Sequence, residues 1–103
     1  MNYTNSIGAV VKILETPKKK VIRNNILVTT FRVQLPQTPK NYVVFLKIWG
    51  NLVNDVLKYY SMNDYILVEG YLAIKSNENK NSKFRSKKKI EITVLKVYPF
   101  FLK

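Results

Sequence analysis

Residues 41–75 read NYVVFLKIWGNLVNDVLKYYSMNDYILVEGYLAIK, and this stretch decides the fold. It begins with an alternating pattern, breaks at Gly50, continues with apolar residues at helical spacing, and then alternates again. Alternation at every second residue predicts a strand with one buried face, whereas recurrence every three or four residues predicts an amphipathic helix. The stretch therefore predicts a strand over 41–49, a short helix capped by Asn51, and a strand over 65–75.

The strand over 41–49 sorts its side chains onto two faces, because successive side chains of a strand point to opposite sides. The face expected to fill the core carries Tyr42, Val44, Leu46 and Ile48, and the other face carries Val43, Phe45, Lys47 and Trp49. Large rings on an outer surface are costly unless something covers them. The second face is therefore the candidate functional surface.

Three further strands are expected, over 5–14, 26–35 and 90–98. The polar segment between the first two is expected to be a turn region, and residues 76–89 to be a long basic hairpin loop. In the strand over 65–75, the residues expected to point inward are Ile66, Val68, Leu72 and Ile74.

The order of three strands, one helix and two strands is the layout of an OB-fold. This all-β fold is a five-stranded antiparallel Greek-key barrel with one helix between strands 3 and 4. An SH3-like barrel would lack the helix, and a ferredoxin-like fold would need two. The 103 residues suffice for one domain, which we expect to span residues 1–103.

Charge and composition narrow the function. Lys and Arg number 18 against 6 Asp and Glu, and the formal net charge of +12 favours a polyanionic partner such as nucleic acid. Codon bias in an A/T-rich genome is the alternative, since Lys and Asn dominate the polar residues. Cysteine and histidine are absent, so we expect no enzyme, cofactor or metal. We also expect no secretory signal and no membrane span.

Phe45, Lys47 and Trp49 form a ring-cation-ring strip suited to single-stranded nucleic acid, whose bases stack on aromatic rings. Arg32 and Gln34 on the preceding strand are expected to extend this strip. The remaining candidate residues are Tyr71 and Lys75 on the fourth strand, and Phe84, Arg85 and Lys87 in the basic loop. The alternative is that the rings pack against a second subunit or another protein, because interfaces are also rich in aromatic residues.

Several segments resemble the bacterial-type single-stranded DNA-binding protein family: NSIGAVVKI (5–13), TTFRVQL (29–35) and residues 43–75. The most specific parts are Trp49-Gly50 and the Val-Glu-Gly-x-Leu motif of residues 68–72. The chain is also similar to the small single-strand-binding-like proteins encoded in algal plastid genomes.

The resemblance implies non-catalytic, largely sequence-independent binding of single-stranded DNA in replication, recombination or repair, by a homodimer or homotetramer. It implies a plastid location, with the cytoplasm or nucleoid of an A/T-rich organism as the alternative. Trp49 matches one stacking position of the family, but three others fall on Val43 and near Lys40 and Asn77. The family's acidic C-terminal tail for partner proteins is not expected here. RNA binding by the same face and a protein-assembly module remain open.

Overall fold

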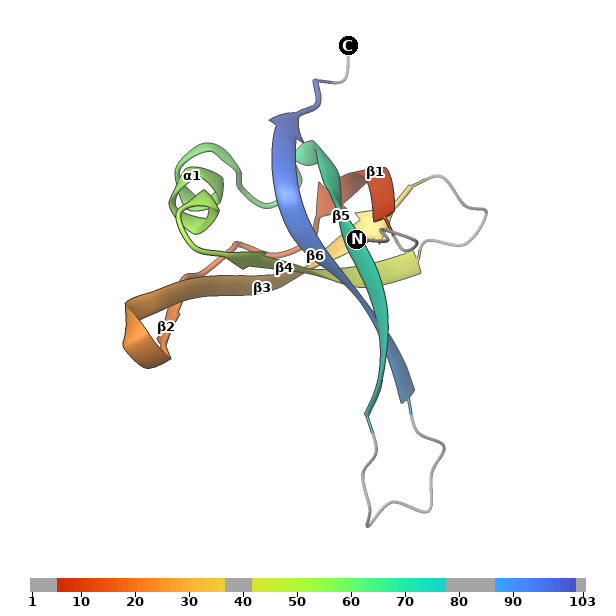
Figure 1. Cartoon of the computed structure of the whole chain (residues 1–103). Helices are drawn as coiled ribbons and strands as arrows, with labels where there is room; N and C mark the ends of the chain where they lie inside the picture. The colour runs from red at the N-terminus through yellow and green to blue at the C-terminus, as the bar shows by residue number, and fades with distance from the viewer. Residues whose placement is uncertain (1–5, 37–41, 78–86, 102–103) are drawn as a thin grey trace.

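A computed structural model describes residues 6–36, 42–77 and 87–101 (Figure 1). The long strands are β1 (Ser6–Ile13), β3 (Ile26–Leu35), β4 (Tyr42–Trp49), β5 (Tyr65–Asn77) and β6 (Lys87–Pro99). The short strand β2 (Lys20–Ile22) precedes β3, and the helix α1 (Leu52–Tyr59) lies between β4 and β5. The helix thus follows the third long strand, as predicted. Because β2 is an additional strand, the helix follows the fourth strand when every strand is counted.

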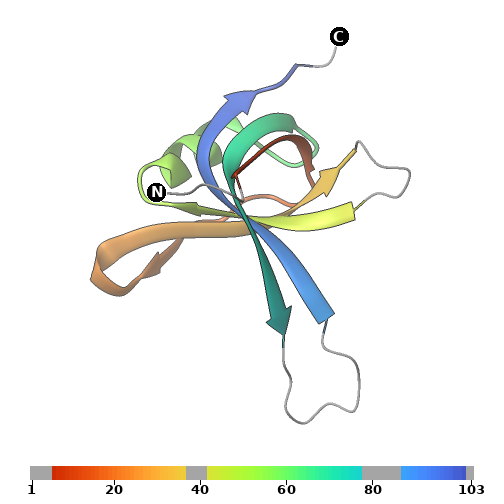
Figure 2. The same cartoon turned by 45° about the vertical axis from the view of Figure 1, so that its right-hand side comes forward.

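The five long strands close into a ring. The sheet order is β1-β5-β6-β4-β3-β2, and an additional pairing of β1 with β3 completes the barrel (Figure 2). This pairing uses only Lys12 and Ile13 of β1, opposite Gln34 and Val33 of β3. The OB-fold prediction is confirmed. One detail differs from an all-antiparallel sheet, because β4 and β6 run parallel.

The core follows the alternation predicted from the sequence. Apolar side chains from all five long strands fill the barrel, and the helix closes one end with Val53 and Val56, both fully buried. The largest buried strand residues are Ile13, Phe31, Leu46, Ile48, Ile66 and Ile92. Their burial removes apolar surface from water, which is the main stabilising term for a barrel of this size.

Two stretches differ from the prediction. The segment before the second long strand contains β2, which pairs with the start of β3 through a turn at Asn24 and Asn25, both with positive φ. The predicted loop over 76–89 is shorter at both ends, since β5 continues to Asn77 and β6 begins at Lys87. Figures 1 and 2 show β5 and β6 leaving the barrel together as a two-stranded arm.

One residue predicted to point into the core does not do so, and the arm explains why. Ile74 has the parity of the core face but is 63% exposed, because it lies on β5 beyond the end of the barrel, where that face meets solvent. Tyr42 is exposed for the equivalent reason, since it is the first residue of β4. Parity alone therefore identifies a face but not where the barrel ends.

The turn at Gly50 joins β4 to α1. Gly50 has φ of 72°, a conformation that glycine adopts without steric cost. Its backbone N–H donates to Leu27 O at 2.9 Å, and its carbonyl accepts from Val53 N at 3.0 Å. Asn51 is the N-cap residue of α1, as predicted, but its side chain makes no capping hydrogen bond. The turn fixes Trp49 at the end of β4.

Candidate nucleic-acid interface

The outward face of β4 carries the predicted ring-cation-ring strip. Val44, Leu46 and Ile48 are buried, whereas Phe45 and Lys47 are half-buried and Trp49 is 41% exposed. The alternation predicted from the sequence is therefore confirmed for these positions. Trp49 lies outside the barrel, at the end of the strand.

Strand register extends the strip into a wider surface. Phe45 lies between Arg32 of β3 and Glu91 of β6, and Lys47 lies between Thr30 and Thr93. On the far side of β6, Glu91 faces Ala73 and Thr93 faces Tyr71 of β5. We call the outward side chains of β3, β4, β6 and β5 around Phe45 and Lys47 the outer sheet face.

Both rings of the strip have an ammonium group close to them. Lys47 Nζ lies 4.8 Å from the centroid of the Trp49 ring, and Lys89 Nζ lies 4.0 Å from that of Phe45. These distances are within the range of cation–π attraction. The outer sheet face thus combines stacking surfaces with cations that can pair with phosphates.

Arg32, predicted to extend the strip, already has a partner. Its backbone N–H donates to Glu15 Oε1 at 3.1 Å, and its Nε donates to Glu15 Oε2 at 3.0 Å. The ion pair ties the segment after β1 to β3, beside the hydrogen bond from Leu14 N to Arg32 O. Gln34, also predicted, is half-buried at the junction of β3 with β1 and β4.

Glu91 is a residue of this face that the sequence analysis did not single out. It is 4% exposed, and its Oε1 lies 2.9 Å from Lys75 Nζ while its Oε2 lies 4.0 Å from Lys89 Nζ. A buried carboxylate needs such partners, since an unpaired charge away from water is strongly destabilising. The available signal was its outward position in β6 with lysines on the flanking strands. Lys75, predicted as a binding residue, is therefore ion-paired.

The other predicted residues divide into two groups. Tyr71 lies on the outer sheet face, in the same row as Lys47 and Thr93. Lys87 is the first residue of β6, opposite Asn77. Phe84 and Arg85, the other two candidates in the basic loop, lie outside the described residues.

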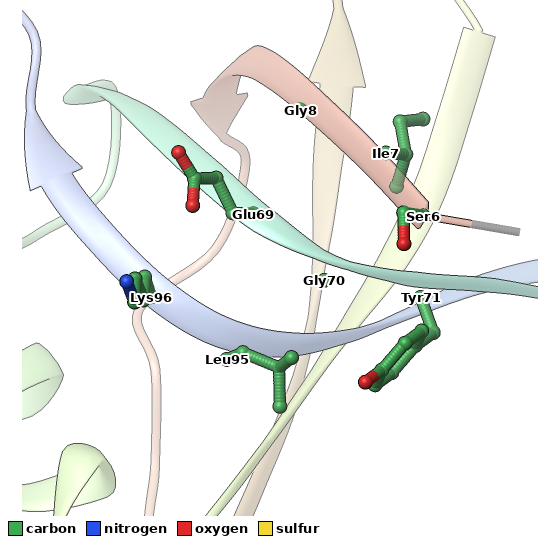
Figure 3. A pocket seen from close by; sticks show the side chains of 8 residues that line it. All are labelled: Ser6, Ile7, Gly8, Glu69, Gly70, Tyr71, Leu95 and Lys96. Carbon is green, nitrogen blue, oxygen red and sulfur yellow. The ribbon is translucent and has the colours of Figure 1, made fainter. Parts of the chain in front are cut away.

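Gly70, in the Val-Glu-Gly-x-Leu motif, lies against the backbone of Thr93 and Val94 in β6. A Cβ at this position would lie 2.0 Å from Thr93 O, so the site requires glycine. The register shifts here, because Glu69 pairs with Lys96 while Gly70 pairs with Val94. This β-bulge adjoins an open pocket of about 530 Å³, with Glu69 and Lys96 near one end and Ser6 and Tyr71 near the other (Figure 3). A bulge bends the strands that it joins, and this one lies just before the part of β5 that pairs with β6 alone.

A second hollow, of about 310 Å³, lies at the end of α1, where Tyr59, Tyr60 and Tyr65 meet Phe100 and Phe101. Burial raises the pKa of the Tyr60 hydroxyl above its ordinary value of 10.0, and the Asp55 carboxylate adds to the effect. Within the described ranges, no group of three or more acidic, Cys or His side chains could hold a metal ion. No helix in those ranges is long and apolar enough to span a membrane.

Comparison with known proteins identifies the family. A scan against models of known protein families finds no match. The chain is 34% identical over 106 residues to the "Putative single-stranded DNA-binding protein ycf41" of Trieres chinensis, which covers 99% of this chain and 91% of that protein. The chain belongs to the single-stranded DNA-binding protein family, in its ycf41 branch.

Solved structures show that this chain shares its fold with bacterial proteins. The SSB domain of a Synechococcus sp. protein matches with a TM-score of 0.74 and 24% identity, over 95% of this chain and 98% of that one. A small single-stranded DNA-binding protein from Streptomyces coelicolor matches at 0.73 and 17%, over 97% and 96%. The second such protein of Mycobacterium smegmatis matches at 0.70 and 21%, over 92% and 87%. At these identities the likeness concerns the fold.

Proposed function

We propose that this chain is a non-catalytic protein that binds single-stranded DNA on the outer sheet face with little dependence on base sequence. The observation that carries the proposal is the position of Trp49 and Phe45, two rings on the outside of the barrel with cations beside them. Every base has a π face, so stacking on such rings tolerates any sequence. Membership of the single-stranded DNA-binding protein family supports the same function.

Titration of the protein with oligo-dT tests this proposal. Trp49 is the single tryptophan, so its fluorescence reports on this face alone. We expect its emission to change on binding, and the affinity to fall by about 0.7 log units per log unit of salt for each phosphate engaged. Unchanged emission at saturating oligomer and low salt would count against the proposal.

RNA binding by the same face is the first alternative. Stacking and phosphate pairing do not distinguish the sugar strongly, so the same side chains could hold either polymer. Competition between dT and U oligomers of equal length decides between them. Preference for DNA requires that the U oligomer displace a labelled dT oligomer only at higher concentration.

A protein-assembly role is the alternative from a different class. The start of β4 exposes apolar surface, since Tyr42 is 52% and Val43 49% exposed, and such surface also suits a protein partner. Affinity purification before and after nuclease treatment distinguishes nucleic-acid binding from protein assembly. Partners that remain after nuclease, together with no oligo-dT binding, would favour assembly.

We also propose that the protein works as a homo-oligomer in the plastid, in DNA replication, recombination or repair. The family resemblance of the sequence supports the homo-oligomer, and the ycf41 relative supports the plastid location. Light scattering measures the assembly, and organelle fractionation with an antibody locates the protein. A monomeric mass, or a protein confined to the non-plastid fraction, would overturn the corresponding part.

A further inference from the structure

The rings of Phe45 and Trp49 on β4 each carry an ammonium group where a stacked base would lie. Lys89 Nζ is only 4.0 Å from the Phe45 centroid, and Lys47 Nζ is 4.8 Å from that of Trp49. Stacked rings lie within similar distances of one another. A base and an ammonium group therefore cannot occupy the same face of one ring.

An ion pair with Glu91 holds the ammonium group of Lys89 over Phe45. Glu91 is the register partner of Phe45, and its carboxylate is almost fully buried. It lies 4.0 Å from Lys89 Nζ and 2.9 Å from Lys75 Nζ, so two lysines share one carboxylate. If Lys89 leaves, Glu91 keeps its closer partner Lys75. Glu91 therefore keeps an ion-pair partner throughout the exchange, which avoids the large free-energy cost of an unpaired buried charge.

We infer that Glu91 is a positioning residue that keeps Lys89 over Phe45 in the free protein, and that binding exchanges this lysine for a base. The base takes the ring face, and Lys89 moves to a phosphate of the same strand. Cation–π attraction at an exposed site is weaker than base stacking, so the exchange favours the bound strand. Duplex DNA offers no unstacked base and leaves Lys89 in place. The device therefore favours single strands over duplexes, and it rests on the proposed function.

The position of Lys89 can be followed by NMR in the unmodified protein. Protons above an aromatic ring resonate upfield, so the side-chain methylenes of Lys89 should be shifted by Phe45, and Phe45→Leu should remove the shift. Saturating oligo-dT should also remove it, whereas a blunt-ended DNA duplex with the same number of phosphates should leave it. A shift that persists while oligo-dT changes the Trp49 emission would overturn the exchange but not DNA binding. If the emission does not change either, the proposed function itself fails.

Glu91→Gln tests the positioning role. It should weaken the upfield shift of Lys89 in the free protein and tighten oligo-dT binding by about 2- to 5-fold, because the pair that holds Lys89 is long, at 4.0 Å, and its lysine is partly exposed. Glu69→Gln is the matched control, because it removes the same charge from an exposed site opposite Lys96. Equal tightening by both variants would show that net charge alone explains the effect, and would overturn the role of Glu91. If Glu91→Gln does not fold, the NMR measurement on the unmodified protein still decides the exchange.

Discussion

Replacing Trp49 by alanine should weaken binding of single-stranded DNA without changing its dependence on salt. One stacked base contributes about 1–3 kcal/mol, so the loss should raise Kd by about 5- to 150-fold. Lys47 lies 4.8 Å from the ring and keeps its charge when the ring is removed. The number of phosphates neutralised, and with it the salt slope, should therefore stay the same. Lys47→Gln, in contrast, removes a charge and should reduce the salt slope by about 0.7.

The assay needs an external reporter, because Trp49→Ala removes the only tryptophan. Anisotropy of a labelled oligo-dT, measured at several salt concentrations, gives both the affinity and the slope. Thermal unfolding of each variant checks that the fold is retained, since the ring is partly buried against the sheet.

Tyr59→Ala is the matched control. Tyr59 is a 64% exposed ring with Lys58 Nζ 5.3 Å from its centroid, but it lies on α1 and not on the outer sheet face. Its loss should leave Kd within about twofold, as for a surface change away from the site. The reasoning is refuted if Trp49→Ala binds as tightly as the unmodified protein, or if Tyr59→Ala loses as much affinity.

Three further predictions concern stability. Gly70→Ala should lower the free energy of unfolding, measured in urea, by about 3 kcal/mol or more, because its Cβ would lie 2.0 Å from Thr93 O. Gly8→Ala is the control and should change this free energy little, since the nearest atom to its Cβ lies at 4.0 Å. Equal effects of the two variants would contradict this prediction. Thr29→Val should raise that free energy by about 1 kcal/mol, because the buried Thr29 Oγ1 has no hydrogen-bond partner among the described residues; a loss in urea unfolding would show that the hydroxyl is paired. The raised pKa of Tyr60 implies stability that is present below pH 10 and lost as the pH rises through the folded pKa, so between pH 9 and 11 the unmodified protein should lose more stability than Tyr60→Phe, and parallel losses would contradict this.

Much of the fold could be predicted from local patterns. Period-two alternation located the five long strands, and the spacing of Val53 and Val56 located the helix, because both patterns reflect burial on one face. The parallel pairing of β4 with β6 joins segments far apart in sequence, and no local pattern records it. The exposure of Ile74 was missed for a similar reason, since the end of the barrel depends on where other strands stop.

The candidate site could be predicted only in part. The outward position of Trp49 and Phe45 followed from strand parity. The ion pairs that occupy Arg32 and Lys75 did not, because Glu15 and Glu91 come from distant segments brought together by the strand register. Charge counting treats every cation as available, and in this chain two of the predicted phosphate partners are already engaged with carboxylates.

The thin closure between β1 and β3 has a consequence for Arg32. The two strands meet only at Lys12 and Ile13, so this seam is the part of the ring most easily opened by thermal fluctuation. Glu15 follows β1 and Arg32 belongs to β3, so separation of the strands also pulls these two side chains apart. Opening of this seam therefore also frees the Nε–H group of Arg32 for another anion, such as a phosphate.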